Sequence, residues 1–167
     1  SVTGVITINV RDVNEMPVLT ANQPLTLNKA ASAPITAALL AATDEDTAHG
    51  PGQLTFIVVT APAHGTLKKS GAALGAGGAF TQTDVNTSAL SYQHDGTPTT
   101  SDGFTFSVSD GAGGSIGNQR FVVAVTPINL LPTLSDTANR TIDEDTVFNA
   151  TVTVGDAETS AGSLLVT

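Results

Sequence analysis

The chain has 167 residues, and its 15 acidic side chains against six basic ones give a formal net charge of −9. This balance argues against nucleic acid or an anionic membrane as a partner and favours a cation. The sequence contains no cysteine and no apolar run of membrane-spanning length, so we expect neither disulfides nor membrane insertion in this segment.

The first predicted element is residues 4–10, where apolar and polar side chains alternate as they do in a half-buried strand. Pro17 cannot donate a ladder hydrogen bond and therefore ends this stretch. Between them, Asp12, Asn14 and Glu15 place three oxygen-bearing side chains close together in the sequence. The segment predicts a stiff linker that closes one module and opens the next.

The linker pattern recurs after a second alternating stretch. Asn14, Pro17 and Leu19 correspond to Asn129, Pro132 and Leu134, all at one offset, which is the length of a domain. This repetition predicts tandem modules. We expect 1–16 to be the last strand and linker of a preceding module, 17–127 a complete module, and 128–167 the N-terminal part of a following module.

The central module begins with two strand patterns that contain interruptions or proline. Residues 18–20 and 25–27 are expected to form a broken first strand. We interpret 33–42 as a strand rather than a helix, because Pro34 and the acidic turn at 43–46 bracket it closely.

The rest of the module alternates strands with turns. Strands are expected at 54–60, 65–69, 89–94 and 104–109, with a last strand that ends near Val125. Asp84 is expected to cap a short turn at 80–86. About seven strands joined by short loops indicate an all-β, two-sheet sandwich.

Acidic motifs stand beside the ends of these strands, and they resemble the cadherin family. Asp12-Val13-Asn14-Glu15-Met16-Pro17 is similar to the cadherin inter-domain linker, Asp-x-Asn-Asp-x-Pro. Ala42-Thr43-Asp44-Glu45-Asp46 resembles the cadherin Asp-x-Asp element in the loop after the second strand. Asp110 falls where such domains place a further aspartate before the final strand.

Other segments resemble related repeats. Residues 62–67, 80–85, 90–96 and 102–111 look like the chondroitin sulfate proteoglycan repeat, a cadherin-related module. Tail residues 142–146 and 154–159 resemble the cadherin-like repeats of large bacterial surface adhesins. The resemblance implies a Greek-key sandwich, calcium at the module junctions, and a role in adhesion or matrix building.

The acidic residues form a candidate calcium site. Residues i and i+2 of an extended segment face the same way, so Asp44 and Asp46 can direct two carboxylates to one point. If the cadherin topology holds, the following candidate ligands converge at one end of the sandwich: Asp12, Asn14, Asp44, Asp46 and Asp110, with Glu15 as a further candidate. The alternative is a solvated acidic turn at 44–46 and an Asx-turn at Asp110.

The second junction differs from the first. Asp156 and Glu158 match Asp44 and Asp46 in role, which makes them further candidate metal ligands. The second linker, however, has Pro127 and Leu130 at the positions of Asp12 and Glu15. We therefore predict a drier junction, in which Leu130 and Leu131 pack between modules.

The remaining polar residues predict no catalytic site. His49, His64 and His94 each stand beside a predicted turn, and we interpret all three as structural. A catalytic triad could be suggested from Ser91, His94 and Asp102. The sequence, however, has no supporting motif, such as a Gly-x-Ser-x-Gly elbow. We therefore do not expect an enzyme.

These features predict a non-enzymatic, extracellular or cell-surface repeat module with calcium-stiffened junctions. It would form the stalk of a bacterial adhesin or a surface filament. Expected partners are calcium ions, neighbouring modules and copies of the chain itself, with glycans or cell-surface proteins as further candidates.

Two alternatives remain. A carbohydrate-binding module of a secreted enzyme or matrix protein would need exposed aromatic rings, and the sequence offers one tyrosine and six phenylalanines. A polymer could form if the short tail borrowed strands from a neighbouring copy.

Overall fold

The computed structural model describes residues 3–9, 11, 13–46, 48–135, 139, 141–149, 151–156, 158–159 and 161–164. The chain divides into two units, Ser1–Pro127 and Ile128–Thr167, and each is described by itself. Among the described residues, no helix is long and apolar enough to cross a bilayer.

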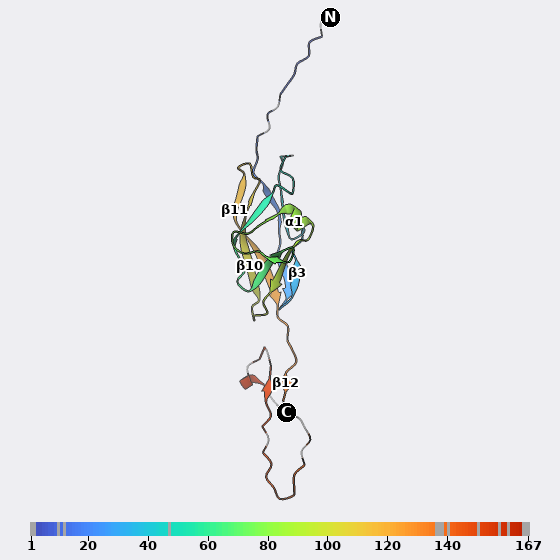
Figure 1. The fold of residues 1–167 in the computed structure, drawn as a ribbon, viewed down its shortest axis with the longest axis vertical. Helices are drawn as coiled ribbons and strands as arrows, with labels where there is room; N and C mark the ends of the chain where they lie inside the picture. Colours follow the sequence, from blue (N-terminus) through green and yellow to red (C-terminus); the bar gives the residue numbers. More distant parts are fainter. Residues whose placement is uncertain are drawn as a thin grey trace. The chain divides into compact units, whose positions relative to one another are not determined.

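Alternation of apolar and polar residues builds a five-stranded sheet in the first unit (Figure 1). In spatial order its strands are β2 (Leu25–Asn28), β11 (Ser115–Thr126), β10 (Ser101–Ser109), β5 (Thr55–Thr60) and β8 (Ala79–Thr81). β2 runs parallel to β11, and the other neighbours are antiparallel. The turn between β10 and β11 carries Asp110.

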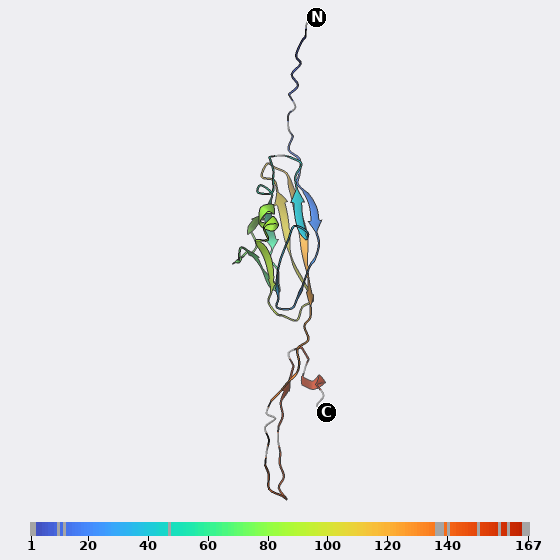
Figure 2. The same cartoon turned by 90° about the vertical axis from the view of Figure 1, so that its right-hand side faces the viewer.

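A second sheet and a separate strand pair complete this unit. The four-stranded sheet has the order β3 (Ser32–Pro34), β9 (Leu90–His94), β6 (Gly65–Lys69) and β7 (Ala72–Ala73). β1 (Val18–Asn22) and β4 (Leu40–Thr43) run antiparallel, side by side (Figure 2). β1 follows the linker and β4 leads into the acidic loop, so this pair brings linker and loop together.

The core contains residues from both sheets. Five buried phenylalanines come from the five-stranded sheet, and Phe56 and Phe80 stack with their ring centroids 4.8 Å apart. Leu67, Leu90 and Tyr92 of the second sheet belong to the same buried cluster. Consecutive strands such as β2 and β3 lie in different sheets. The predicted all-β, Greek-key sandwich is therefore confirmed.

Residues 33–42 do not form the single strand predicted from the sequence. β3 ends at Pro34 and β4 begins at Leu40, and a turn closed by a 2.9 Å hydrogen bond from Leu39 N to Thr36 O separates them. Pro34 lies in an outer strand of the four-stranded sheet, where proline costs no ladder bond. The split lets β4 leave that sheet and pair with β1.

The predicted turn at 80–86 is partly a helix. Helix α1 spans Gln82–Asn86, and its N-cap is Thr81, whose hydroxyl accepts from Asp84 N. Asp84 is the third helical residue, and its carboxylate accepts from Thr81 N at 2.7 Å, which completes a capping box. The buried side chain of Gln82 accepts from Ala42 N at 2.8 Å, so α1 is fixed to the strand before the acidic loop.

The strand predicted at 4–10 is not found. Residues 3–9 belong to no strand, residue 10 lies outside the described residues, and Val5 and Ile6 are 94% and 87% exposed. An alternating pattern forms a strand only where another strand supplies ladder bonds. The assignment of this segment to a preceding module stays a prediction.

The second unit repeats one feature of the first. Its strands β12 (Thr133–Leu134) and β13 (Val154–Gly155) pair antiparallel, and η1 (Ala161–Ser163) follows. Thr133 and Leu134 pair with Gly155 and Val154, just as Val18 and Leu19 pair with Thr43 and Ala42 in β1 and β4. In both units the second strand of the pair is followed directly by an aspartate.

Candidate metal centre

The acidic loop after β4 contains a carboxylate with an unsatisfied oxygen. The side chain of Asp44 is 0% exposed, and its Oδ1 accepts from Asp46 N at 2.9 Å. Its Oδ2 is buried without a hydrogen-bond partner among the described residues. Burying a carboxylate oxygen without a partner is costly, so this atom is a candidate to bind a cation.

Asp110 approaches the loop from the turn between β10 and β11. Its Oδ1 accepts from Ala112 N at 2.7 Å and from Gly114 N at 3.0 Å, which is the Asx-turn considered above. Its Oδ2 accepts from the Asn14 side-chain amide at 3.0 Å. The turn therefore orients this carboxylate and also ties it to the linker.

The linker makes a second contact with the same cluster. Glu15 N donates to Asp46 Oδ2 at 3.0 Å, while Asn14 reaches Asp110. Two consecutive linker residues are thus bound to carboxylates that come from separate loops. Gly114 allows this approach, because a Cβ there would lie 2.7 Å from the Glu15 carbonyl oxygen.

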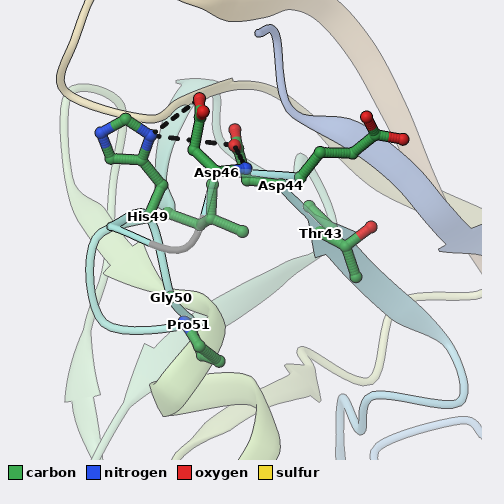
Figure 3. Close-up of a pocket in the computed structure, with 9 residues that line it drawn as sticks. Thr43, Asp44, Asp46, His49, Gly50 and Pro51 are labelled. Carbon is green, nitrogen blue, oxygen red and sulfur yellow. Dashed lines mark hydrogen bonds and ion pairs between the residues drawn. The ribbon is translucent and has the colours of Figure 1, made fainter. Parts of the chain in front are cut away.

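His49, which the sequence predicted to be structural, also lies in the cluster. Its Nδ1 lies 3.3 Å from Asp46 Oδ2 and 3.7 Å from Asp44 Oδ1, and Figure 3 shows the ring turned toward both carboxylates. One ligand atom each from Asp44, His49 and Asp110 lie within 4.8 Å of one another. In the sequence, the signal that could have identified His49 as part of the site is its position three residues after Asp46.

Two clefts adjoin these side chains. The larger, of about 310 Å³, is lined by Ala42, Thr43, Asp44, Glu45, Asp46, His49, Gly50, Pro51 and Leu54. A smaller one of about 210 Å³ is lined by Asn14, Asp46, Ala48 and His49. Asp46 and His49 belong to both, so the space beside the acidic loop continues toward the linker.

Hydrogen bonds favour the ionised forms of Asp46 and Asp110. The hydrogen bond from Glu15 N, together with His49, lowers the pKa of Asp46 despite some desolvation. The hydrogen bond from the Asn14 amide is the main cause that lowers the pKa of Asp110. Anionic groups held this close repel one another, and a cation in the cleft would relieve that repulsion.

The residues present fit calcium. Calcium takes six to eight oxygen ligands at about 2.3–2.6 Å, so opposite ligands are separated by about 4.6–5.2 Å. In the cluster, the ligand atoms of the Asp44 and Asp110 carboxylates lie within 4.8 Å of each other, close enough for one calcium ion to bridge them. The unpartnered oxygen of Asp44 provides an anionic ligand that no donor of the described chain satisfies.

The structure brings together some of the predicted metal ligands but not all of them. Asp44, Asp46 and Asp110 lie together. Asn14 joins them through its amide nitrogen, so the amide would have to turn over to offer oxygen. Glu15 contributes its main-chain N–H to Asp46, and Asp12 lies outside the described residues.

Asp156 and Glu158 lie in the second unit, in a loop of the same form. Glu158 N donates to Asp156 Oδ1 at 2.9 Å, as Asp46 N does to Asp44 Oδ1. Leu130 N donates to Glu158 Oε2 at 3.1 Å, as Glu15 N does to Asp46 Oδ2. The packing of Leu130 and Leu131 between modules stays a prediction.

The lowered pKa values predict an acid-sensitive centre. A carboxyl whose pKa in the folded state lies below its ordinary value of 3.8 contributes stability that is complete above 3.8 and is lost as the pH falls through the folded value. With metal ions removed by a chelator, we expect the melting temperature of the protein to fall steeply below about pH 4. Asp46→Asn/Asp110→Asn should show a shallower fall in circular dichroism melts. Parallel pH profiles for the two proteins would contradict this prediction.

Comparison of the sequence with known proteins identifies relatives of this chain. Residues 17–127 match a family model described as cadherin-like. Over 106 residues the chain is 41% identical to chondroitin sulfate proteoglycan 4 of Homo sapiens, covering 63% of this chain and 4% of that protein. Over 122 residues it is 38% identical to FRAS1-related extracellular matrix protein 1 of Homo sapiens, covering 72% of this chain and 5% of that protein.

A third relative extends the similarity into the second unit. Extracellular matrix organizing protein FRAS1 of Homo sapiens is 29% identical over 164 residues, which is 96% of this chain and 4% of that protein. The chain spans 5% or less of the length of these three relatives. The match over 17–127 covers well over half of the sequence, so the chain belongs to the cadherin-like family.

Proposed function

We propose that this chain is a non-enzymatic, extracellular structural or adhesive module whose linker is held in place by calcium. The observation that carries the proposal is the pair of linker contacts, from Asn14 to Asp110 and from Glu15 to Asp46. These contacts join the linker to the acidic cluster, as a calcium-held junction would require. The relatives, named as a proteoglycan and as extracellular matrix proteins, support the extracellular location.

A bound calcium ion would supply the positive charge that the cluster lacks. Asp44, Asp46 and Asp110 would hold it, with His49 at the edge of the cleft. Two of these carboxylates also hold the linker main chain and Asn14, so fixing them fixes the direction in which the linker leaves the sandwich. In a string of such modules, this would stiffen the stalk of a surface adhesin, matrix protein or filament.

The second unit supports a tandem arrangement. It repeats the register of the first strand pair and two hydrogen bonds of the acidic loop. The same local design at both positions favours 128–167 as the start of a following cadherin-like module. Neighbouring modules are then the nearest partners of this one.

The sugar-binding alternative receives little support from the ring positions. In the first unit, Tyr92 and the five phenylalanines are 0% exposed, and the one remaining ring, Phe148 in the second unit, is 47% exposed. Stacking on a sugar needs an accessible ring face. We therefore do not adopt this alternative.

Calcium should stabilise the chelated protein measurably. For a dissociation constant of roughly 10⁻⁴ to 10⁻³ M, typical of extracellular modules, about 10 mM calcium adds about 1.4–2.7 kcal/mol to the free energy of unfolding. Thermal or urea unfolding with and without calcium measures this gain. Asp44→Asn should remove most of it, because the buried carboxylate loses its charge while keeping its shape.

Asp95→Asn is the matched control. The Asp95 carboxylate is bonded to Thr97 within its own turn and is absent from the cluster, so calcium should stabilise this variant as it does the parent. A calcium gain that survives intact in Asp44→Asn would refute the proposed site.

A further inference from the structure

The histidine in the cluster distinguishes this site from an all-oxygen calcium site. Calcium binds oxygen ligands, whereas imidazole nitrogen suits zinc and other first-row transition metals. His49 presents Nδ1, rather than an oxygen, to the carboxylates of Asp44 and Asp46. We infer that the cleft also binds a transition-metal dication of the zinc class, with His49 Nδ1 as a ligand, in competition with calcium.

The spacing of the donor atoms suits a small dication. Zinc bound tetrahedrally at about 2.0–2.2 Å has ligand atoms roughly 3.4 Å apart. His49 Nδ1 already lies 3.3 Å from Asp46 Oδ2 and 3.7 Å from Asp44 Oδ1. Asp110 lies within 4.8 Å of Asp44 and His49, and it would have to move closer and exchange some of its present hydrogen bonds to serve as the fourth ligand.

Burial and access also agree with a metal ligand set. The Asp44 side chain is 0% exposed, with Oδ2 unpartnered among the described residues, and it lines the same cleft as His49. The His49 side chain retains 16% exposure, so solvent and ions can reach the ring. Figure 3 shows the ring and the two carboxylates converging from one loop. Nitrogen and carboxylate ligands together form a common donor set for zinc.

This inference rests on the proposed function only in using the same cleft, and the two can be tested separately. Isothermal titration of the chelator-stripped protein with zinc alone, calcium alone, and zinc after calcium measures both affinities and their competition. We expect His49→Gln to weaken zinc binding by more than the roughly 10-fold that loss of a second-shell partner costs. Calcium affinity should change little, because glutamine offers an oxygen. Asp44→Asn should weaken both ions.

His64 provides the control for zinc that binds to a histidine outside the proposed site. His64 contacts Thr97 and is absent from the cluster, so His64→Gln should leave zinc affinity unchanged. Cobalt substitution gives an independent readout, because loss of a nitrogen ligand shifts the visible absorption of the bound ion. The shift is expected for His49→Gln and not for His64→Gln.

The outcomes separate the two proposals. Equal zinc affinity in the parent and His49→Gln, or no zinc binding beside normal calcium binding, overturns the inference and leaves the calcium proposal standing. Zinc binding that needs His49, without calcium binding, supports the inference and overturns the calcium proposal. Binding of neither ion overturns both.

Discussion

Asp102→Ala is expected to lower the free energy of unfolding by about 3–5 kcal/mol, because each buried donor left without an acceptor costs about 1–3 kcal/mol. Asp102 is 5% exposed, and its carboxylate accepts from Ala63 N at 3.0 Å, His64 N at 2.9 Å and the Tyr92 hydroxyl at 2.8 Å. Alanine would leave these donors buried without an acceptor. The change would loosen the connection between β10 and the β5–β6 loop.

The hydrogen-bond network also determines the pKa of Asp102. Burial by itself raises the pKa of Asp102, but the hydrogen bonds from Tyr92 and from main-chain N–H groups outweigh burial and lower the pKa. The same burial and the nearby Asp102 raise the pKa of Tyr92 well above its ordinary value. At neutral pH, the Asp102 carboxylate is therefore an anionic acceptor and the Tyr92 hydroxyl is a neutral donor.

Urea unfolding followed by circular dichroism measures this loss. Asp102→Asn should fall between the parent and Asp102→Ala, because an amide oxygen still accepts hydrogen bonds. Asp95→Ala is the control, since Asp95 is exposed, bonds Thr97 within its own turn and otherwise lies 3.9 Å from His94 Nε2; its effect on the free energy of unfolding should be small. A loss in Asp102→Ala no larger than that of Asp95→Ala would show that the network contributes little.

Gly114→Ala is expected to destabilise the chain by about 2–3 kcal/mol and to weaken calcium binding in the same variant. An added Cβ would lie 2.7 Å from the Glu15 carbonyl oxygen and 3.0 Å from Met16 Cα, and it would also clash with the Asp110 carboxylate. Two of these neighbours are main chain, so a side-chain rotation cannot relieve the contact. Either the linker or the Asp110 turn must move, and both contribute contacts to the candidate metal centre.

Gly117→Ala is the matched control for this prediction. Gly117 lies in β11, and a Cβ there would meet nothing within 4 Å. Its effect on unfolding should stay within about 0.5 kcal/mol, and calcium should stabilise it like the parent. If Gly114→Ala matched Gly117→Ala in both measurements, the close approach of linker and turn would have no energetic role.

The sequence predicted the strands of the first unit well where the pattern was strong. The segments expected at 54–60 and 65–69 correspond to β5 and β6, and 89–94 to β9. Side-chain alternation is a local property, since successive residues of a strand face opposite sides wherever the strand lies. It predicted where strands form, but not which strands pair.

The sequence by itself determined the strand pattern, the acidic motifs and the family resemblance, because each depends on residues close together in the chain. Only the tertiary structure decided that 33–42 divides between two sheets, that Asn14 meets Asp110 through its amide nitrogen, and that His49 joins the cluster. These features depend on contacts between segments far apart in sequence. Such contacts follow from how the two sheets close around the core, which no local pattern records.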